Sequence, residues 1–117
     1  MKFERVAIIG LGLLGGSIGL AVKERLPAIA TTGWDRDPAT RARAAERGLV
    51  GTVCETGAEA VANADLVIFC VPVGAIGEVA ADLAGAIPAG AVISDVGSSK
   101  QSVATALAEA LPGNVVI

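Results

Sequence analysis

The sequence predicts an α/β domain built as a doubly wound parallel sheet of about six strands, in three α/β/α layers. Short apolar runs alternate along the chain with helical periodicity, and the connections between them are short, which favours right-handed crossovers and one open sheet. Of the 117 residues 53% are hydrophobic but only 3% are aromatic, so that aliphatic side chains must form the core. This length fits one domain, which we expect to span residues 1–117.

A glycine-rich turn separates the first predicted strand from the first predicted helix. The apolar run 6–9 ends at Gly10 and indicates a short buried strand. Apolar residues at every fourth position then predict a helix over 14–26, and Pro27 ends it because proline cannot continue the hydrogen-bond ladder. The residues expected to share one face of this helix are Leu14, Ile18, Val22 and Leu26.

The rest of the chain continues the alternation. Asp37 and Pro38 are typical of an N-cap and a first helical residue, and Gly48 is typical of a helix end. Thr56 and Glu59 have the spacing of a capping box. We expect further strands over 29–34, 50–53, 66–71, 91–95 and 114–117, and helices over 38–48, 56–63 and 73–86, with a last helix capped by Ser98 or Ser99 and packed through Val103, Leu107 and Leu111.

Charge and composition exclude several classes of partner and site. The net charge of −3, without a long Lys/Arg run, argues against nucleic acid. No apolar stretch approaches the ~20 residues of a membrane span, and no targeting segment is visible, so a cytoplasmic protein is expected. Cys54 and Cys70 lie outside metal-ligand spacings and are expected to be reduced thiols, with no metal bound. The chain has no histidine, the commonest general base.

The turn after the first strand has the spacing of a dinucleotide-binding loop. Gly10, Gly12 and Gly15 match GxGxxG between a predicted strand and a predicted helix, although glycine-rich turns also serve plain packing. Gly10 is expected to allow the tight turn, Gly12 to let the pyrophosphate approach, and Gly15 to let helix and strand pack closely. The pyrophosphate would meet unbonded N–H groups at the positive end of the helix dipole, beside Leu13 and Leu14.

An acidic residue at the end of the second strand supports this interpretation. Asp35 lies twenty residues after Gly15, where a carboxylate can accept hydrogen bonds from both hydroxyls of the adenosine ribose and repel a 2′-phosphate. A turn or cap role for Asp35 is the alternative, although Asp37 is better placed as a cap. Arg36 could stack on adenine, neutralise a 2′-phosphate or remain a solvated charge. The pattern favours NAD, with NADP as the alternative.

Four segments resemble one family: 10–17 (GLGLLGGS), 33–38 (GWDRDP), 64–72 (ADLVIFCVP) and 95–100 (DVGSSK). Over essentially its whole length the chain resembles the N-terminal NAD(P)-binding domain of prephenate and arogenate dehydrogenases. The resemblance implies a Rossmann-type fold and an intact enzyme of tyrosine biosynthesis. Such an enzyme oxidatively decarboxylates prephenate or arogenate, a cyclohexadienyl substrate, with hydride transfer to NAD(P).

The resemblance also implies roles for individual residues. Ser98 matches the serine that hydrogen-bonds the substrate hydroxyl and helps to orient the catalytic histidine, with a plain helix cap as the alternative. Cys70, Val71 and Pro72, at the end of the fourth strand, would border the nicotinamide and its ribose, unless Pro72 merely ends the strand. The family's histidine lies in a GHPxAG-like segment expected beyond residue 117. We therefore expect a fragment that binds cofactor without turnover, and a homodimer formed through a helical C-terminal domain.

Two other functions stay open. An NAD-sensing regulatory module could use the same loop without any redox step. The cofactor domain of another dehydrogenase, of the β-hydroxyacid or pyrroline-carboxylate type, would also share this fold. The segment that follows residue 117 in the intact protein would discriminate among these possibilities.

Overall fold

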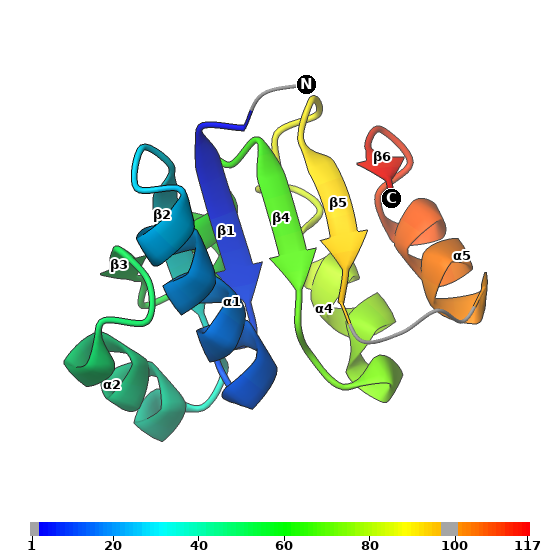
Figure 1. Ribbon diagram of the computed structural model, residues 1–117. Coiled ribbons are helices and arrows are strands. Elements are labelled where there is room, and N and C mark those ends of the chain that lie inside the picture. Colours follow the sequence, from blue (N-terminus) through cyan, green and yellow to red (C-terminus); the bar gives the residue numbers. More distant parts are fainter. Residues whose placement is uncertain (1–2, 97–100) are drawn as a thin grey trace.

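The computed structural model describes residues 3–96 and 101–117, without the side chains of 101–104. Its six strands are all parallel and form one sheet in the order β3-β2-β1-β4-β5-β6 (Figure 1). From β1 the chain adds β2 and β3 toward one edge of the sheet, and it then adds β4, β5 and β6 toward the other edge. The boundary between β1 and β4 is therefore the switch point of a doubly wound fold. The predicted fold class is confirmed.

The elements follow the predicted alternation. The strands are β1 (Arg5–Ile9), β2 (Ala30–Trp34), β3 (Thr52–Val53), β4 (Leu66–Phe69), β5 (Val92–Asp95) and β6 (Val115–Val116). The helices are α1 (Leu13–Arg25), α2 (Pro38–Arg47), α3 (Gly57–Val61), α4 (Ile76–Leu83) and α5 (Gln101–Ala110), with a 3₁₀ turn, η1 (Val73–Ala75), before α4.

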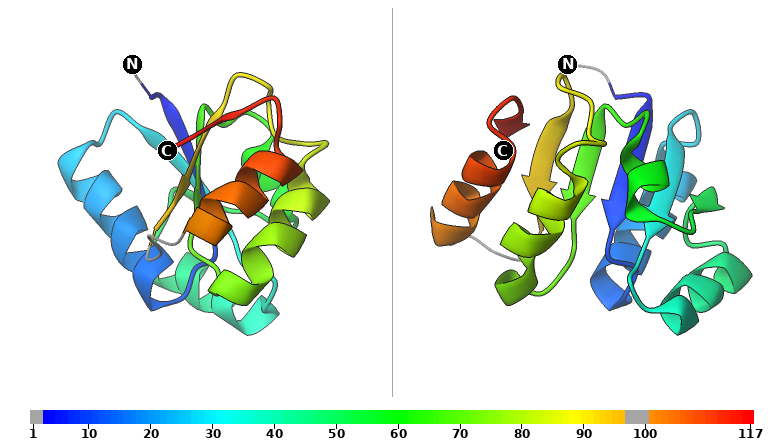
Figure 2. Two further views of the ribbon diagram at one scale, coloured as in Figure 1. Left: turned by 90° about the vertical axis from the view of Figure 1, so that its right-hand side faces the viewer. Right: turned by 180° about the vertical axis from the view of Figure 1, so that it is seen from behind.

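The helices form one layer on each face of the sheet. Helices α1 and α2 cover one face, and α3, α4 and α5 cover the other (Figure 2). Because successive residues of a strand point to opposite faces, Ile8 packs in the cluster under α1 and α2, whereas Ile9 packs in the cluster under α3, α4 and α5. Burial on both faces explains why β4 is a continuous apolar run.

Helices α2 and α3 begin at the predicted capping residues, and α2 also ends at the predicted glycine. The Asp37 carboxylate accepts a hydrogen bond from the N–H of Ala39 at 3.0 Å and caps α2, which ends at Gly48 with a left-handed φ of 62°. The hydroxyl of Thr56 accepts from the N–H of Glu59 at 3.1 Å and caps α3. The cap expected at Ser98 or Ser99 lies outside the residues that the structure describes.

The face expected for α1 packs only in part, since Ile18 lies against the core but the two ends of the face do not. Leu14 and Leu26 are 45% and 52% exposed, and the buried residues of the helix are Gly15, Gly16 and Gly19. The backbone of α1 lies so close to the glycine loop and to Leu49 that no side chain fits between them. Periodicity therefore locates this helix correctly but predicts only part of the side that it buries.

The helix expected over 73–86 is shorter and irregular at its start. It begins with the 3₁₀ turn Val73–Ala75, and α4 ends at Leu83. Gly74 and Gly77 lie in these first turns, and glycine is a poor helix former. The strand expected over 66–71 ends at Phe69, so that Cys70 and the two residues after it belong to a loop.

Candidate functional site

The glycine loop joins β1 to α1 at the carboxyl edge of the sheet. Gly10 has a φ of 101°, a left-handed conformation that residues with side chains rarely adopt. Its N–H donates a hydrogen bond to the carbonyl of Trp34 at 2.8 Å, and a Cβ at this position would lie 2.5 Å from the carbonyl oxygen of Cys70. The turn therefore requires glycine at position 10.

The next two glycines differ in their surroundings. A Cβ on Gly15 would overlap the carbonyl oxygen of Gly10, so the close approach of helix and strand also requires glycine. A Cβ on Gly12, by contrast, would meet nothing within 4 Å. Gly12 is the N-cap of α1 and makes no side-chain cap, so it opens on space in front of N–H groups that lack intrahelical partners. Such a helix end attracts anions.

Asp35 directly follows β2 and lies beside this loop. Its Oδ2 accepts a hydrogen bond from the N–H of Leu11 at 2.8 Å, and its Oδ1 accepts from the N–H of Asp37 at 2.9 Å. A carboxylate offers about four acceptor positions, so two remain for other donors. Arg41 donates to the main-chain carbonyl of Asp35 at 2.7 Å and ties α2 to the end of β2.

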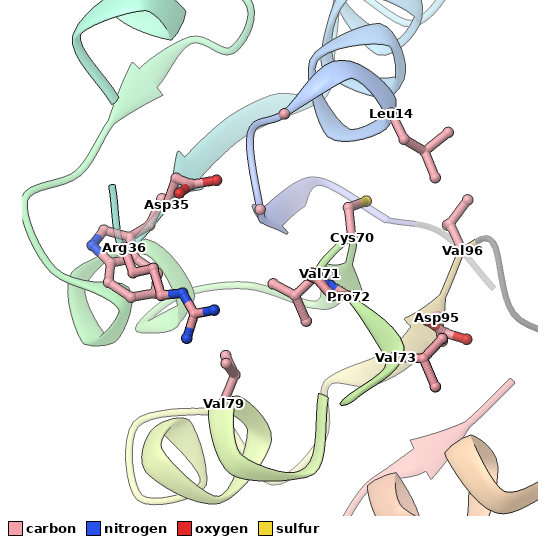
Figure 3. Close-up of a pocket in the computed structure, with 13 residues that line it drawn as sticks. Leu14, Asp35, Arg36, Cys70, Val71, Pro72, Val73, Val79, Asp95 and Val96 are labelled. Atoms are coloured by element: carbon pink, nitrogen blue, oxygen red, sulfur yellow. The ribbon is translucent and has the colours of Figure 1, made fainter. Parts of the chain in front are cut away.

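These residues border a cleft of about 480 Å³ at the switch point of the sheet (Figure 3). Its walls come from the carboxyl ends of β1, β2, β4 and β5, where doubly wound folds bind their ligands. Figure 3 shows Asp35 and Arg36 on one side, and Val73, Asp95 and Val96 on the other. The predicted binding residues that line the cleft are Gly10, Gly12, Leu14, Asp35, Arg36, Cys70, Val71 and Pro72.

Two predicted binding residues do not line this cleft. Leu13 is 92% exposed and borders a smaller groove between α1 and α2, and Gly15 is buried against the loop. Ser98, the predicted catalytic residue, lies outside the part of the chain that the structure describes.

The fold adds cleft residues that sequence reasoning missed: Trp34, Val73, Val79, Asp95 and Val96. Trp34 and Asp95 could have been found, because each is the last residue of a strand that ends at this edge of the sheet. Val79 had no such signal, because its contribution depends on how α4 is placed over the sheet.

Burial and charge set the chemistry of the cleft's inner wall. Burial raises the pKa of the Cys70 thiol to about 11, and the charge of Asp95 adds to this effect. The thiol is therefore protonated at neutral pH and forms a neutral wall. Burial also raises the pKa of the Asp95 carboxyl, whose Oδ1 has no hydrogen-bond partner among the described residues. Within the same part of the chain, no cluster of His, Cys, Asp and Glu could hold a metal ion.

Fold and site together define a class of protein. A doubly wound sheet, a glycine loop at a helix N-terminus and an acidic residue after β2 characterise nucleotide-binding domains of the Rossmann type. A family model described as the nucleotide-binding domain of prephenate dehydrogenase matches residues 18–117, and the chain belongs to this family. Because the match begins after Gly15, the glycine loop is evidence independent of it.

Relatives and solved structures agree with this assignment. A cyclohexadienyl dehydrogenase of Zymomonas mobilis is 40% identical over 115 residues, which cover 98% of this chain and 39% of the relative. The crystal structure of an arogenate dehydrogenase from Synechocystis matches 96% of this chain and 39% of its own, with a TM-score of 0.85 at 24% identity. A prephenate dehydrogenase from Aquifex aeolicus, in complex with hydroxyphenyl propionate and NAD+, matches 95% of this chain and 39% of its own, with a TM-score of 0.83 at 23% identity.

The predicted family is thus confirmed, and the two solved structures add support for the fold. The chain spans about two-fifths of the length of these proteins, since it covers 39% of each. No helix in residues 3–96 and 101–117 is long and apolar enough to cross a membrane.

Proposed function

We propose that this chain binds NAD in the cleft and is the cofactor domain of a prephenate or arogenate dehydrogenase. The observation that carries the proposal is the glycine loop, where Gly12 opens on the cleft directly beside the Asp35 carboxylate. The NAD+ complex of the Aquifex aeolicus relative supports the choice of cofactor.

The geometry suggests how each part of the dinucleotide is held. The pyrophosphate lies at the N-terminus of α1 in front of Gly12, where N–H groups and the helix dipole stabilise negative charge. The adenosine ribose donates its hydroxyls to the remaining acceptor positions of Asp35, which disfavours a 2′-phosphate and hence NADP. Arg36 lines the same side of the cleft and can stack on the adenine.

The nicotinamide end lies along the residues that follow β4. Cys70, Val71 and Pro72 form an uncharged wall there, because the thiol keeps its proton, and this wall shields the reacting ring from water. NAD bound along this wall would supply the acceptor for the hydride that leaves the hydroxyl-bearing carbon of the substrate. The substrate's ring carboxylate leaves as carbon dioxide, and an aromatic ring forms.

Further parts of the proposal rest on family resemblance. Ser98 holds the substrate hydroxyl, and a helical C-terminal domain supplies the catalytic histidine, the rest of the substrate site and the homodimer contacts. Residues 1–117 alone then bind cofactor without turnover, because proton transfer and substrate orientation supply much of the rate. The intact enzyme acts in tyrosine biosynthesis in the cytoplasm.

Replacing Gly12 by valine tests the pose directly. The new side chain points into open space, so the fold should persist, but it would occupy the volume of the pyrophosphate. We expect NAD affinity to fall at least about a hundredfold, because the phosphates then lose their charge-assisted contacts with the helix end. Calorimetric titration measures the affinity, and quenching of Trp34, the single tryptophan and a cleft residue, provides a second readout.

The matched control is Gly90→Val, since a Cβ on Gly90 also meets nothing within 4 Å and Gly90 does not line the cleft. Its NAD affinity should equal that of the unsubstituted chain. Equal NAD affinity in the Gly12 variant would refute the pose, and a wild-type chain that binds neither NAD nor NADP would refute the proposed function. Assays of the intact enzyme with prephenate and with arogenate would identify its substrate.

A further inference from the structure

We propose that Asp35 is also a positioning residue, whose carboxylate holds the glycine loop in the conformation that binds the pyrophosphate. The inference deepens the proposed function and rests on it. Ribose recognition uses the two acceptor positions of the carboxylate that face the ligand. Loop positioning uses the other two, which are occupied in the protein without any ligand.

The hydrogen bond between Leu11 and Asp35 carries this inference. The N–H of Leu11 lies between the first two glycines of the loop and donates to Asp35 Oδ2 at 2.8 Å, a length typical of charge-assisted bonds. Leu11 is only 3% exposed, so without Asp35 its N–H would be left poorly hydrated, which is unfavourable. The loop therefore depends on this carboxylate before any nucleotide arrives.

The carboxylate is itself held in place by its neighbours. The N–H of Asp37 donates to Asp35 Oδ1 at 2.9 Å, and Arg41 donates to the main-chain carbonyl of Asp35 at 2.7 Å. A continuous set of hydrogen bonds thus runs from α2 through Asp35 to the glycine loop. These bonds act together with the buried Leu11 side chain, which packs in the cluster under α1 and α2, and fix the backbone of the loop.

Two neighbouring N–H groups of the loop are directed at the end of β2. Gly10 donates to the Trp34 carbonyl at 2.8 Å, and Leu11 donates to the Asp35 carboxylate. With this part of the loop fixed against β2, the following residues start α1 and present their N–H groups to the cleft, because the first turn of a helix has no internal acceptors for them. Losing the Asp35 contact frees the loop to rotate these donors away from the phosphates.

The same arrangement recurs where no ligand is expected. At the amino edge of the sheet, Asp65 accepts from the N–H of Glu4 and from the N–H of Arg5, each at 3.0 Å. Asp65 is half-buried like Asp35 but does not line the cleft. It therefore serves as a matched control for a carboxylate that only links two segments of the fold.

The two roles of Asp35 can be separated with a nucleotide that lacks ribose hydroxyls. Asp35→Ala should weaken ADP binding whether Asp35 contacts only the ribose or also positions the loop. If Asp35 acts only on the ribose, Asp35→Ala should leave the affinity for 2′,3′-dideoxy-ADP unchanged. If it also positions the loop, dideoxy-ADP affinity should fall about tenfold, as expected for the loss of one hydrogen bond to a charged group.

The experiment compares ADP and dideoxy-ADP on the wild-type chain and on Asp35→Ala, Asp65→Ala and Asp37→Asn, by calorimetry and Trp34 fluorescence. Asp65→Ala should lower the unfolding temperature without changing either affinity. Asp37→Asn removes a nearby charge but keeps an acceptor for the cap of α2, so it measures the purely electrostatic effect on the phosphates. The proposal is supported if Asp35→Ala lowers the affinity for dideoxy-ADP more than Asp37→Asn does.

Amide hydrogen exchange of Leu11 gives a readout that needs no ligand. We expect exchange at Leu11 to accelerate at least about tenfold in Asp35→Ala. In Asp35→Asn, whose amide oxygen can still accept from Leu11, exchange should stay near the wild-type rate, which separates loss of the acceptor from loss of the charge. Unchanged exchange at Leu11, or unchanged dideoxy-ADP affinity, in Asp35→Ala would overturn the positioning role but leave the proposed function intact. If the wild-type chain binds neither NAD nor ADP, the proposed function fails first, and the inference fails with it.

Discussion

The helices on the two faces of the sheet approach it in different ways. Under α3, α4 and α5 the core is made of interlocking side chains, among them Phe69, Ile76 and Leu107. Helix α1, on the other face, approaches mainly through its backbone at Gly15, Gly16 and Gly19, and Ile18 adds a half-buried side-chain contact. The difference shows that the helix whose N-terminus faces the cleft lies close to the sheet because glycines, rather than large side chains, occupy most of its contact.

The helices themselves reflect this difference. Ile76 and Leu83 of α4 are buried, whereas Leu13, Leu14 and Leu20 of α1 are exposed. We therefore expect added atoms to be harmful on the α1 face and removed atoms to be harmful on the α4 face. The following substitutions test this contrast, beginning with the largest expected effect.

Adding one methyl group at Gly15 should be the most disruptive change. A Cβ there overlaps the backbone oxygen of Gly10, which cannot move aside like the end of a flexible side chain. We expect Gly15→Ala to lower the free energy of unfolding by more than about 4 kcal/mol, or to prevent folding, as severe core strain does. Urea unfolding followed by circular dichroism measures this change.

The control adds the same methyl group at Gly12, where no atom lies within 4 Å. Gly12→Ala should cost about 1 kcal/mol or less, since Gly12 is only a helix cap. Unfolding of Gly15→Ala at the wild-type urea concentration would show that α1 is not packed through its backbone.

Removing a side chain should be most harmful on the opposite face. Phe69 is fully buried in the cluster under α3, α4 and α5, so Phe69→Ala should cost about 3–5 kcal/mol through lost burial and a cavity. Val115, which is 61% exposed on β6, provides the control, and Val115→Ala should change stability by about 0.5 kcal/mol or less. Similar costs for the two variants would contradict a side-chain core on this face.

The smallest expected effect concerns two thiols, one packed against each cluster. Burial raises the pKa of Cys70 to about 11, with the charge of Asp95 adding to it, and burial raises the pKa of Cys54 as well, helped by the charge of Glu59. The folded protein therefore keeps these protons at pH values where the unfolded chain has lost them. Stability should be fully retained below pH 9.0, the ordinary thiol pKa, and should decrease as the pH rises from there toward about 11.

Alkylation of Cys54→Ser and Cys70→Ser with iodoacetamide, from neutral pH upward, measures each remaining thiol separately. The rate for Cys70 should increase with a midpoint near 11, and bound NAD should slow it, because Cys70 lines the cleft. A midpoint near 9.0 would show that the Cys70 thiol is solvated rather than buried.

The sequence by itself determined the alternation of elements, the position of the glycine loop and the caps of α2 and α3. Each of these depends on residues that are close in the chain. Gly10 can adopt a positive φ because it lacks a side chain, and Asp37 caps a helix two residues away. Local propensities of this kind act before any distant contact forms, which is why they can be predicted from the order of residues.

Only the tertiary structure decided which side of α1 is buried, that Asp35 holds Leu11 across 24 residues of chain, and that Trp34, Val79 and Asp95 share one cleft. These features depend on the strand order β3-β2-β1-β4-β5-β6, which places the ends of β2, β4 and β5 around the glycine loop. Periodicity shows that a helix has an apolar side but not how closely its backbone can approach a sheet. For α1 that distance is set by the glycines and the loop beneath them, and it overrides the preference of the leucines for burial.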